Sequence, residues 1–122
     1  MINPENIFTF NADQSFALNA DNEVHINWNV PKDLPYFEGH FPGNPVLPAV
    51  ALLDLSLVIA NRIDSKVKSM FLTIKSSKFS EVIRPEDMLS VRVKRDSANQ
   101  SWSMDFTNQN DVIVSKLVFQ IT

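Results

Sequence analysis

Two titratable residues stand where they could do chemistry, His40 and Asp54, fourteen positions apart. A histidine changes its protonation state near neutral pH, so His40 could take a proton from a substrate. Asp54 lies in an apolar stretch, and apolar surroundings favour the neutral form of a carboxyl group, which can donate a proton. One base and one acid are the groups that a proton-transfer reaction needs.

Each of the two residues also has a plainer explanation. Asp54 could reach solvent or accept a hydrogen bond from a backbone N–H, and His40 could be a hydrogen-bonded structural group in a loop. The neighbours of His40 favour a functional role, because Gly39 and Gly43 are the 2 glycines of the whole chain and enclose a proline. Glycine lets a ligand approach the backbone closely.

The composition excludes several classes of protein. There is no cysteine and there are only 2 histidines, so we expect no disulfide, no metal site and no cofactor. The net charge of −3 argues against non-specific nucleic-acid binding. The first residues do not read as a signal peptide, and the longest apolar stretch, residues 46–60, is too short to span a membrane. We expect a cytoplasmic protein that binds neither nucleic acid nor membrane.

Hydrophobic periodicity predicts the elements that position His40 and Asp54. Residues 23–30 alternate apolar and polar side chains, which is typical of a half-buried strand. Five of the 7 prolines lie in the loop over residues 31–48. Residues 48–63 are apolar nearly all round, which predicts a helix that is buried on most sides. Residues 8–18 also fit a strand, with less regular alternation.

The second half of the chain has the pattern of antiparallel β-structure. A hairpin turn is predicted at residues 108–111, because Asn and Asp tolerate left-handed backbone. The short connections favour antiparallel pairing. We therefore predict a single α+β domain over residues 1–122, in which an antiparallel sheet wraps one long apolar helix. The predicted strands cover residues 70–75, 89–94, 101–106 and 113–121.

The loop that leads into the helix resembles the signature of a known family. Residues 37–48 read FEGHFPGNPVLP, which is similar to the signature of the β-hydroxyacyl-ACP dehydratases of fatty-acid synthesis. Lys78-Phe79 and the RPED run at residues 84–87 resemble the second half of the same family. The resemblance extends roughly over residues 5–122. It implies the hot-dog fold, a curled antiparallel sheet around one long helix, which matches the architecture predicted from periodicity.

The resemblance also implies roles for individual residues. His40 matches the catalytic histidine, and Asp54 matches the acidic position that is Glu in one branch of the family and Asp in the isomerising branch. In the family the two groups come from different protomers, so a homodimer is implied, with further assembly left open. Two positions depart from the pattern. Ala49 stands where the family usually has Gly, and Val58 stands where it often has a Gln that could orient the acid.

The implied reaction is loss of water from a (3R)-3-hydroxyacyl-ACP thioester to give a trans-2-enoyl-ACP thioester. His40 would take the proton from C2, and Asp54 would protonate the leaving hydroxyl. The resemblance points to the backbone N–H of Ala49 for stabilising negative charge on the thioester oxygen, with the Gly43 N–H as a second donor. The first N–H groups of a helix are unpaired, which suits this role.

The substrate and its carrier protein predict two further sets of residues. An acyl chain needs an apolar tunnel, for which the candidate walls are Phe37, Phe41, Val46, Leu47 and Leu53. The carrier protein is acidic, so basic residues would dock it, and the candidates are Lys75, Lys78, Arg84 and Arg92. Ordinary core packing is the plainer explanation for most of the first set, and a solvated strand face is the plainer explanation for the second.

Three alternatives remain open at this point. An acyl thioesterase on the same fold would use a carboxylate to activate water, although such enzymes usually lack the Gly-His-Phe-Pro-Gly segment. A non-catalytic acyl-ACP-binding subunit is favoured by the departures at Ala49 and Val58. A dehydratase could also act on a polyketide or polyene intermediate instead of a fatty acyl chain, because a fold does not fix its substrate.

Overall fold

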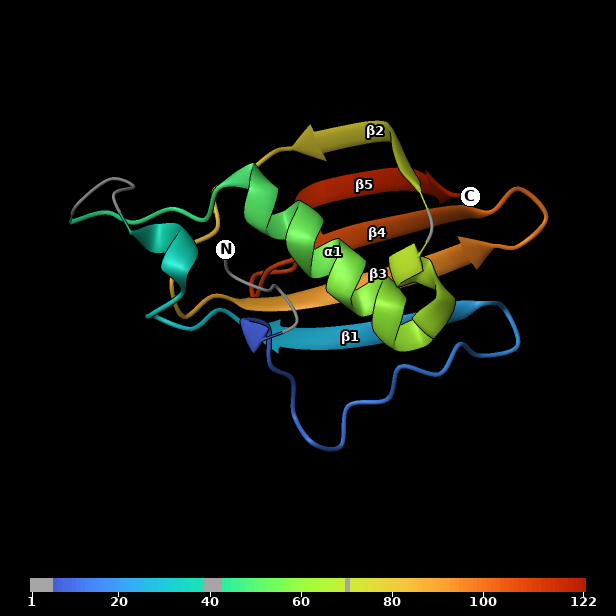
Figure 1. Cartoon of the computed structure of the whole chain (residues 1–122). Helices are drawn as coiled ribbons and strands as arrows, with labels where there is room; N and C mark the ends of the chain where they lie inside the picture. The colour runs from blue at the N-terminus through green and yellow to red at the C-terminus, as the bar shows by residue number, and fades with distance from the viewer. Residues whose placement is uncertain (1–5, 39–42, 70) are drawn as a thin grey trace.

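An antiparallel sheet of five strands carries one long helix on one of its faces in the computed structural model of the chain (Figure 1). The structure describes residues 6–38, 43–69 and 71–122. The helix, α1, runs over Ala49–Ile63, and the short 3-10 turns η2 and η3 run over Pro35–Phe37 and Ser65–Ser69. The strands are β1 (Glu23–Asn29), β2 (Leu72–Phe79), β3 (Met88–Asp96), β4 (Ser101–Thr107) and β5 (Ile113–Ile121).

The strand order in the sheet is β1-β3-β4-β5-β2, so β1 and β2 form the two edges. The inward side chains of β3, β4 and β5 meet in register, with Val91 opposite Phe106 and Met104 opposite Leu117. α1 packs Leu55 and Ile59 against this face, and both are fully buried. The spacing of these two residues places them on one side of the helix, which therefore closes the core over the middle of the sheet.

Most of the predicted elements are confirmed. The strand predicted at 23–30 is β1, the helix predicted at 48–63 is α1 with Pro48 as its N-cap, and the four later strands are β2 to β5. The predicted hairpin turn is also present. Asp111 has a φ of 60°, and the Asn108 side-chain oxygen accepts hydrogen bonds from the Asn110 and Val112 N–H groups. The chain thus makes this turn without glycine.

The strand predicted over residues 8–18 is wrong. That segment is irregular, and it closes the outer edge of β1 with a single side chain. The Gln14 amide donates to the His25 carbonyl at 3.0 Å and accepts from the Asn27 N–H at 2.9 Å. One amide therefore supplies the paired bonds that a neighbouring strand would make, which protects this edge from other chains.

The helix is buried on most of its sides, as predicted, but one apolar side stays exposed. Val50 is 52% exposed and Leu57 is 38% exposed, so α1 keeps an apolar stripe outside the core of the single chain. At the open edge of the sheet, seven of the eight residues of β2 are exposed, including Ile74 and Phe79. No helix in the described ranges is both long enough and apolar enough to cross a membrane.

Candidate active site

Asp54 lies in the second turn of α1 and is half-buried. The helix begins at Ala49 because Pro48 takes an extended conformation, with φ −72° and ψ 155°, and has no N–H to lose. Two residues after Asp54, the buried Ser56 hydroxyl donates to the Leu52 carbonyl of its own helix at 2.7 Å. The Ser56 hydroxyl therefore donates its hydrogen bond within the helix and does not donate it to Asp54.

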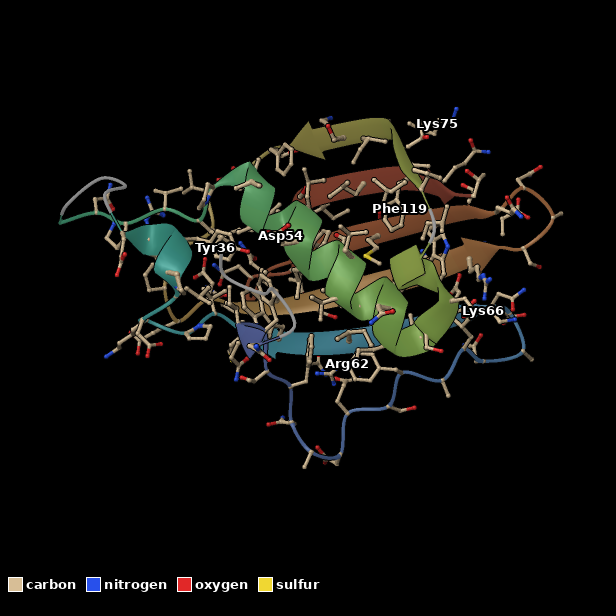
Figure 2. The ribbon with its side chains drawn as sticks, viewed as in Figure 1. Tyr36, Asp54, Arg62, Lys66, Lys75 and Phe119 are labelled. Atoms are coloured by element: carbon tan, nitrogen blue, oxygen red, sulfur yellow. The ribbon has the colours of Figure 1, made fainter. Side chains whose placement is uncertain are left out.

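The partner of Asp54 is Tyr36, which comes from η2 in the loop before the helix. The Tyr36 hydroxyl donates a hydrogen bond to Asp54 Oδ2 at 2.5 Å, and Figure 2 shows the two side chains meeting between η2 and α1. Burial of the ring, together with the Asp54 carboxyl that accepts its hydrogen bond, raises the pKa of the Tyr36 hydroxyl far above its usual value. Tyr36 is therefore a neutral donor under all ordinary conditions.

Aromatic packing fixes the Tyr36 ring. Phe8, which is fully buried, stacks on Tyr36 with ring centroids 5.9 Å apart and an interplanar angle of 28°. Phe8 in turn contacts Trp28 of β1 edge-on at 5.3 Å. The phenol at the end of this row is thus anchored to the sheet while its hydroxyl reaches the helix.

Sequence reasoning missed Tyr36. The contact spans eighteen positions, and no periodicity connects residues at that separation. Two signals were present, since Tyr36 is the 1 tyrosine of the chain and stands four residues before His40. The sequence left two alternatives open for Asp54, a solvent-exposed carboxylate and a bond from a backbone N–H. The structure shows instead a hydrogen bond from the half-buried Tyr36 phenol.

An apolar hollow opens at the first residue of α1. Its volume is about 260 Å³, and the Leu47 N–H binds the Ile83 carbonyl at 2.7 Å to hold its two sides together. One side comes from the start of the helix and the loop before it, and the other from the segment that follows β2. The lining residues are Val46, Leu47, Ala49, Leu52 and residues 79–83.

The structure separates the predicted tunnel residues into three groups. Val46 and Leu47 line the hollow. Phe37 and Leu53 are half-buried and pack against the core, and they are not among the residues that line the hollow. Phe41 lies outside the described residues, as does the predicted base His40. Sequence reasoning did not propose Phe79 and Val82 as lining residues. Both are large apolar residues at or just after the end of β2, a strand of mixed polarity, and this was the available signal.

The two predicted backbone donors lie at the start of α1 and in the loop before it. Ala49 is the first residue of α1 and lines the hollow, and the first intrahelical bond runs from the Ala51 N–H to the Pro48 carbonyl at 3.0 Å. Gly43 has a φ of 84°, a left-handed conformation that other residues rarely adopt. The space around Gly43 is open, so backbone conformation and not crowding favours glycine there.

The predicted docking residues divide between two regions of the surface. Lys75 and Lys78 are exposed on β2, and Arg84 directly follows the hollow-lining Ile83. Arg92 lies on β3, where its guanidinium binds the Glu23 carboxylate at 2.6 Å, and this hydrogen bond lowers the pKa of Glu23. Arg92 is therefore already paired within the chain. Within the described ranges no three acidic or histidine side chains gather in a way that could hold a metal ion.

The family model of the ApeI-like dehydratases matches residues 17–117. The chain belongs to this family. A FabZ 3-hydroxyacyl-[acyl-carrier-protein] dehydratase of Lactiplantibacillus plantarum is 33% identical to it over 88 residues, which are 67% of this chain and 60% of that protein. The match thus spans less than two thirds of the curated relative's length.

Solved structures show that this ApeI-like dehydratase family member has the hot-dog fold. The dehydratase heterocomplex ApeI:P of Xenorhabdus doucetiae matches with a TM-score of 0.73 at 23% identity, covering 84% of this chain and 88% of that one. An uncharacterized protein of Erwinia carotovora matches with a TM-score of 0.72 at 26% identity, covering 85% and 87%. The α+β architecture expected from periodicity is thus confirmed.

Proposed function

We propose that this chain is a hydro-lyase that removes water from (3R)-3-hydroxyacyl thioesters carried on acyl carrier protein and gives trans-2-enoyl thioesters. The observation that carries the proposal is Asp54, a half-buried carboxyl oriented by Tyr36, on the helix whose first residue opens into an apolar hollow. Membership of a dehydratase family and the likeness to a 3-hydroxyacyl-[acyl-carrier-protein] dehydratase support it. The acyl group that the enzyme accepts would decide its pathway, which is the synthesis of fatty acids or of polyketide or polyene chains.

The proposed reaction needs a base, an acid and a group that stabilises negative charge. His40 takes the proton from C2, and the electron pair of that bond forms the C2=C3 double bond. The C3–O bond breaks, and the oxygen leaves as water with the proton of the Asp54 carboxyl. The imidazolium then returns its proton to the carboxylate, which restores both groups. During the reaction the Ala49 N–H, with Gly43 as a second donor, binds the thioester oxygen as charge develops there.

The hollow at Ala49 is the proposed entry for the acyl group. Its walls are mostly apolar. Transfer of an acyl chain from water to such a surface lowers the free energy of the complex. Phe79 and Val82 would contact the chain together with Val46 and Leu47. Arg84, which directly follows the hollow-lining Ile83, would attract an acidic carrier protein. Lys75 and Lys78 would add to this attraction only on a face of β2 that a partner chain leaves open.

A second copy of the chain is the proposed partner of β2. The β1 edge is closed by Gln14, whereas β2 is an exposed edge strand with apolar side chains, a surface that pairs readily with another strand. In such a dimer each Asp54 would act with the His40 of the other copy, as the family resemblance implies. The neighbouring ApeI:P structure is a heterocomplex, so a different dehydratase chain is the alternative occupant.

The role of the Ala49 N–H can be tested by removing only that group. Proline is tolerated in the first turn of a helix, so Ala49→Pro should preserve the fold while deleting the donor. We expect kcat to fall about 10²- to 10³-fold, the usual cost of one oxyanion donor. Ala49→Gly keeps the N–H and serves as the control, with kcat close to that of the parent. Equal kcat values for the two variants would exclude the Ala49 N–H from catalysis.

Turnover of a carrier-bound substrate separates the proposed function from its rivals. The purified chain should convert 3-hydroxyacyl carrier protein to the enoyl form, measured by absorbance of the conjugated thioester. A thioesterase would release free carrier thiol instead. A non-catalytic subunit would bind the acyl carrier protein and leave it unchanged.

A further inference from the structure

We propose that Tyr36 is a positioning residue that determines which oxygen of Asp54 delivers the proton to the leaving hydroxyl. The inference rests on the proposed dehydration and goes beyond it, because it assigns a task to a side chain outside the acid–base pair. The observation is the hydrogen bond from the Tyr36 hydroxyl to Asp54 Oδ2 at 2.5 Å, made by a ring that is packed in place.

The two oxygens of a neutral carboxyl group are not equivalent, since one accepts hydrogen bonds as a carbonyl and the other carries the proton. Tyr36 donates to Oδ2, which favours Oδ2 as the carbonyl-type, accepting oxygen. When Asp54 carries a proton, we therefore place that proton on Oδ1. Without the phenol the two oxygens could exchange these roles by rotation or proton transfer, and part of the acid would point its proton away from the substrate.

The same hydrogen bond strengthens during the reaction. When Oδ1 gives up its proton to the departing hydroxyl, negative charge spreads over both carboxyl oxygens. A hydrogen bond to a charged acceptor is roughly twice as strong as one between neutral groups. Because this gain arises only as the proton leaves, it lowers the barrier of the chemical step and does not tighten substrate binding.

Neighbouring side chains on α1 do not offer Asp54 the same support. Val58, one turn further along the helix, is apolar and 2% exposed, so it cannot orient a carboxyl as a glutamine could. The Ser56 hydroxyl donates its hydrogen bond to the Leu52 carbonyl. Tyr36 is held by stacking on Phe8 and not by the helix, so its hydroxyl can fix the orientation of the Asp54 carboxyl group.

A double-mutant cycle tests the coupling between the two residues. Tyr36→Phe removes the hydroxyl and keeps the ring that stacks on Phe8. We expect kcat to fall about 10- to 100-fold with KM nearly unchanged, the size expected for a hydrogen bond to a charged group. In the Asp54→Asn background the same change should cost less than about two-fold. An equal loss in both backgrounds, or an unchanged kcat in Tyr36→Phe, overturns the proposal.

A second measurement tests the contact without turnover. Tyr36 is the 1 tyrosine of the chain, so phenolate absorbance in an alkaline titration reports this residue alone. The wild-type phenol should ionise at higher pH than in Asp54→Asn, because the Asp54 carboxyl disfavours the phenolate. Ser56→Ala, which alters the same helix without touching Tyr36, should titrate like the wild type.

The two measurements separate failure of this inference from failure of the proposed function. Identical ionisation of Tyr36 in the wild type and in Asp54→Asn overturns the positioning role, whatever the activity. A wild-type chain that dehydrates no 3-hydroxyacyl thioester, yet shows the expected difference in titration, removes the proposed reaction and leaves Tyr36 holding Asp54 for another chemistry.

Discussion

Replacing Asp54 by Asn should lower the rate of dehydration about 10²- to 10⁴-fold, the usual contribution of a general acid. The side-chain amide has nearly the shape of the carboxyl group and can still accept the Tyr36 hydrogen bond through its oxygen. The fold and the packing of η2 on α1 should therefore survive, while the proton needed by the leaving hydroxyl is lost. The measurements are kcat at saturating substrate and the thermal unfolding midpoint of each protein.

Asp64→Asn is the matched control for this prediction. Asp64 caps the other end of α1, is also half-buried, and accepts a hydrogen bond from Arg95 at 3.1 Å. The same chemical change there should leave kcat within about two-fold of the parent, as expected for a residue away from the site. An Asp54→Asn protein with similar activity would remove Asp54 as the acid. The corresponding prediction for the base is that His40→Ala is as inactive as Asp54→Asn.

A charge on the open edge strand should abolish both assembly and activity. Ile74 lies on β2 and is 39% exposed in the single chain, so part of its side chain meets water until a partner covers it. In a dimer that covers β2 the new carboxylate of the Ile74→Asp variant would be buried without a partner, which is strongly unfavourable. We expect the particle mass to fall from dimer to monomer and kcat to fall more than about 100-fold, because each site then lacks the partner's catalytic group.

Met88→Asp provides the comparison for the edge variant. Met88 is 54% exposed at the start of β3, which is separated from β2 by β4 and β5. This variant should remain a dimer with normal activity. A monomeric Ile74→Asp protein that keeps full activity would show that the site is complete within one chain. A parent chain that is monomeric and inactive alone would direct attention to a second, different subunit.

Mixing two inactive variants tests whether the acid and the base come from different copies. After subunit exchange, half of the dimers combine His40→Ala with Asp54→Asn, and one of the two sites in each is then intact. The mixture should recover about one quarter of the wild-type activity, as expected for random pairing in a two-fold symmetric dimer. If exchange is complete and no activity returns, both groups act within one chain.

The sequence predicted the elements well because their signals are local. Alternation along β1 and the apolar run of α1 follow directly from which side chains face the core. The prediction failed over residues 8–18, where the backbone is irregular although Phe8 is buried and Phe10 and Phe16 are half-buried. Alternation indicates which side chains are buried, and an irregular segment can bury the same side chains. Here the segment bonds to the edge of β1 through the side chain of Gln14.

The candidate site was only half visible from the sequence. Asp54 could be singled out because a carboxyl in an apolar helix is locally anomalous. Tyr36 stood out only as the single tyrosine near His40, and its contact with Asp54 could not be predicted, because that contact depends on how η2 packs against α1. The hollow likewise depends on the pairing of Leu47 with Ile83, two residues far apart in the chain. Such contacts are fixed by tertiary packing and leave no trace in residue spacing.

Mass spectrometry of the carrier-bound acyl group tests the central claim most directly. The wild-type chain is incubated with a (3R)-3-hydroxyacyl carrier protein, and the intact carrier is weighed over time beside the Asp54→Asn sample. We predict that the acyl carrier loses the mass of one water in the wild-type sample and stays unchanged in the variant. Release of the bare carrier thiol, or no change in mass with the wild-type chain, would contradict the proposed dehydratase.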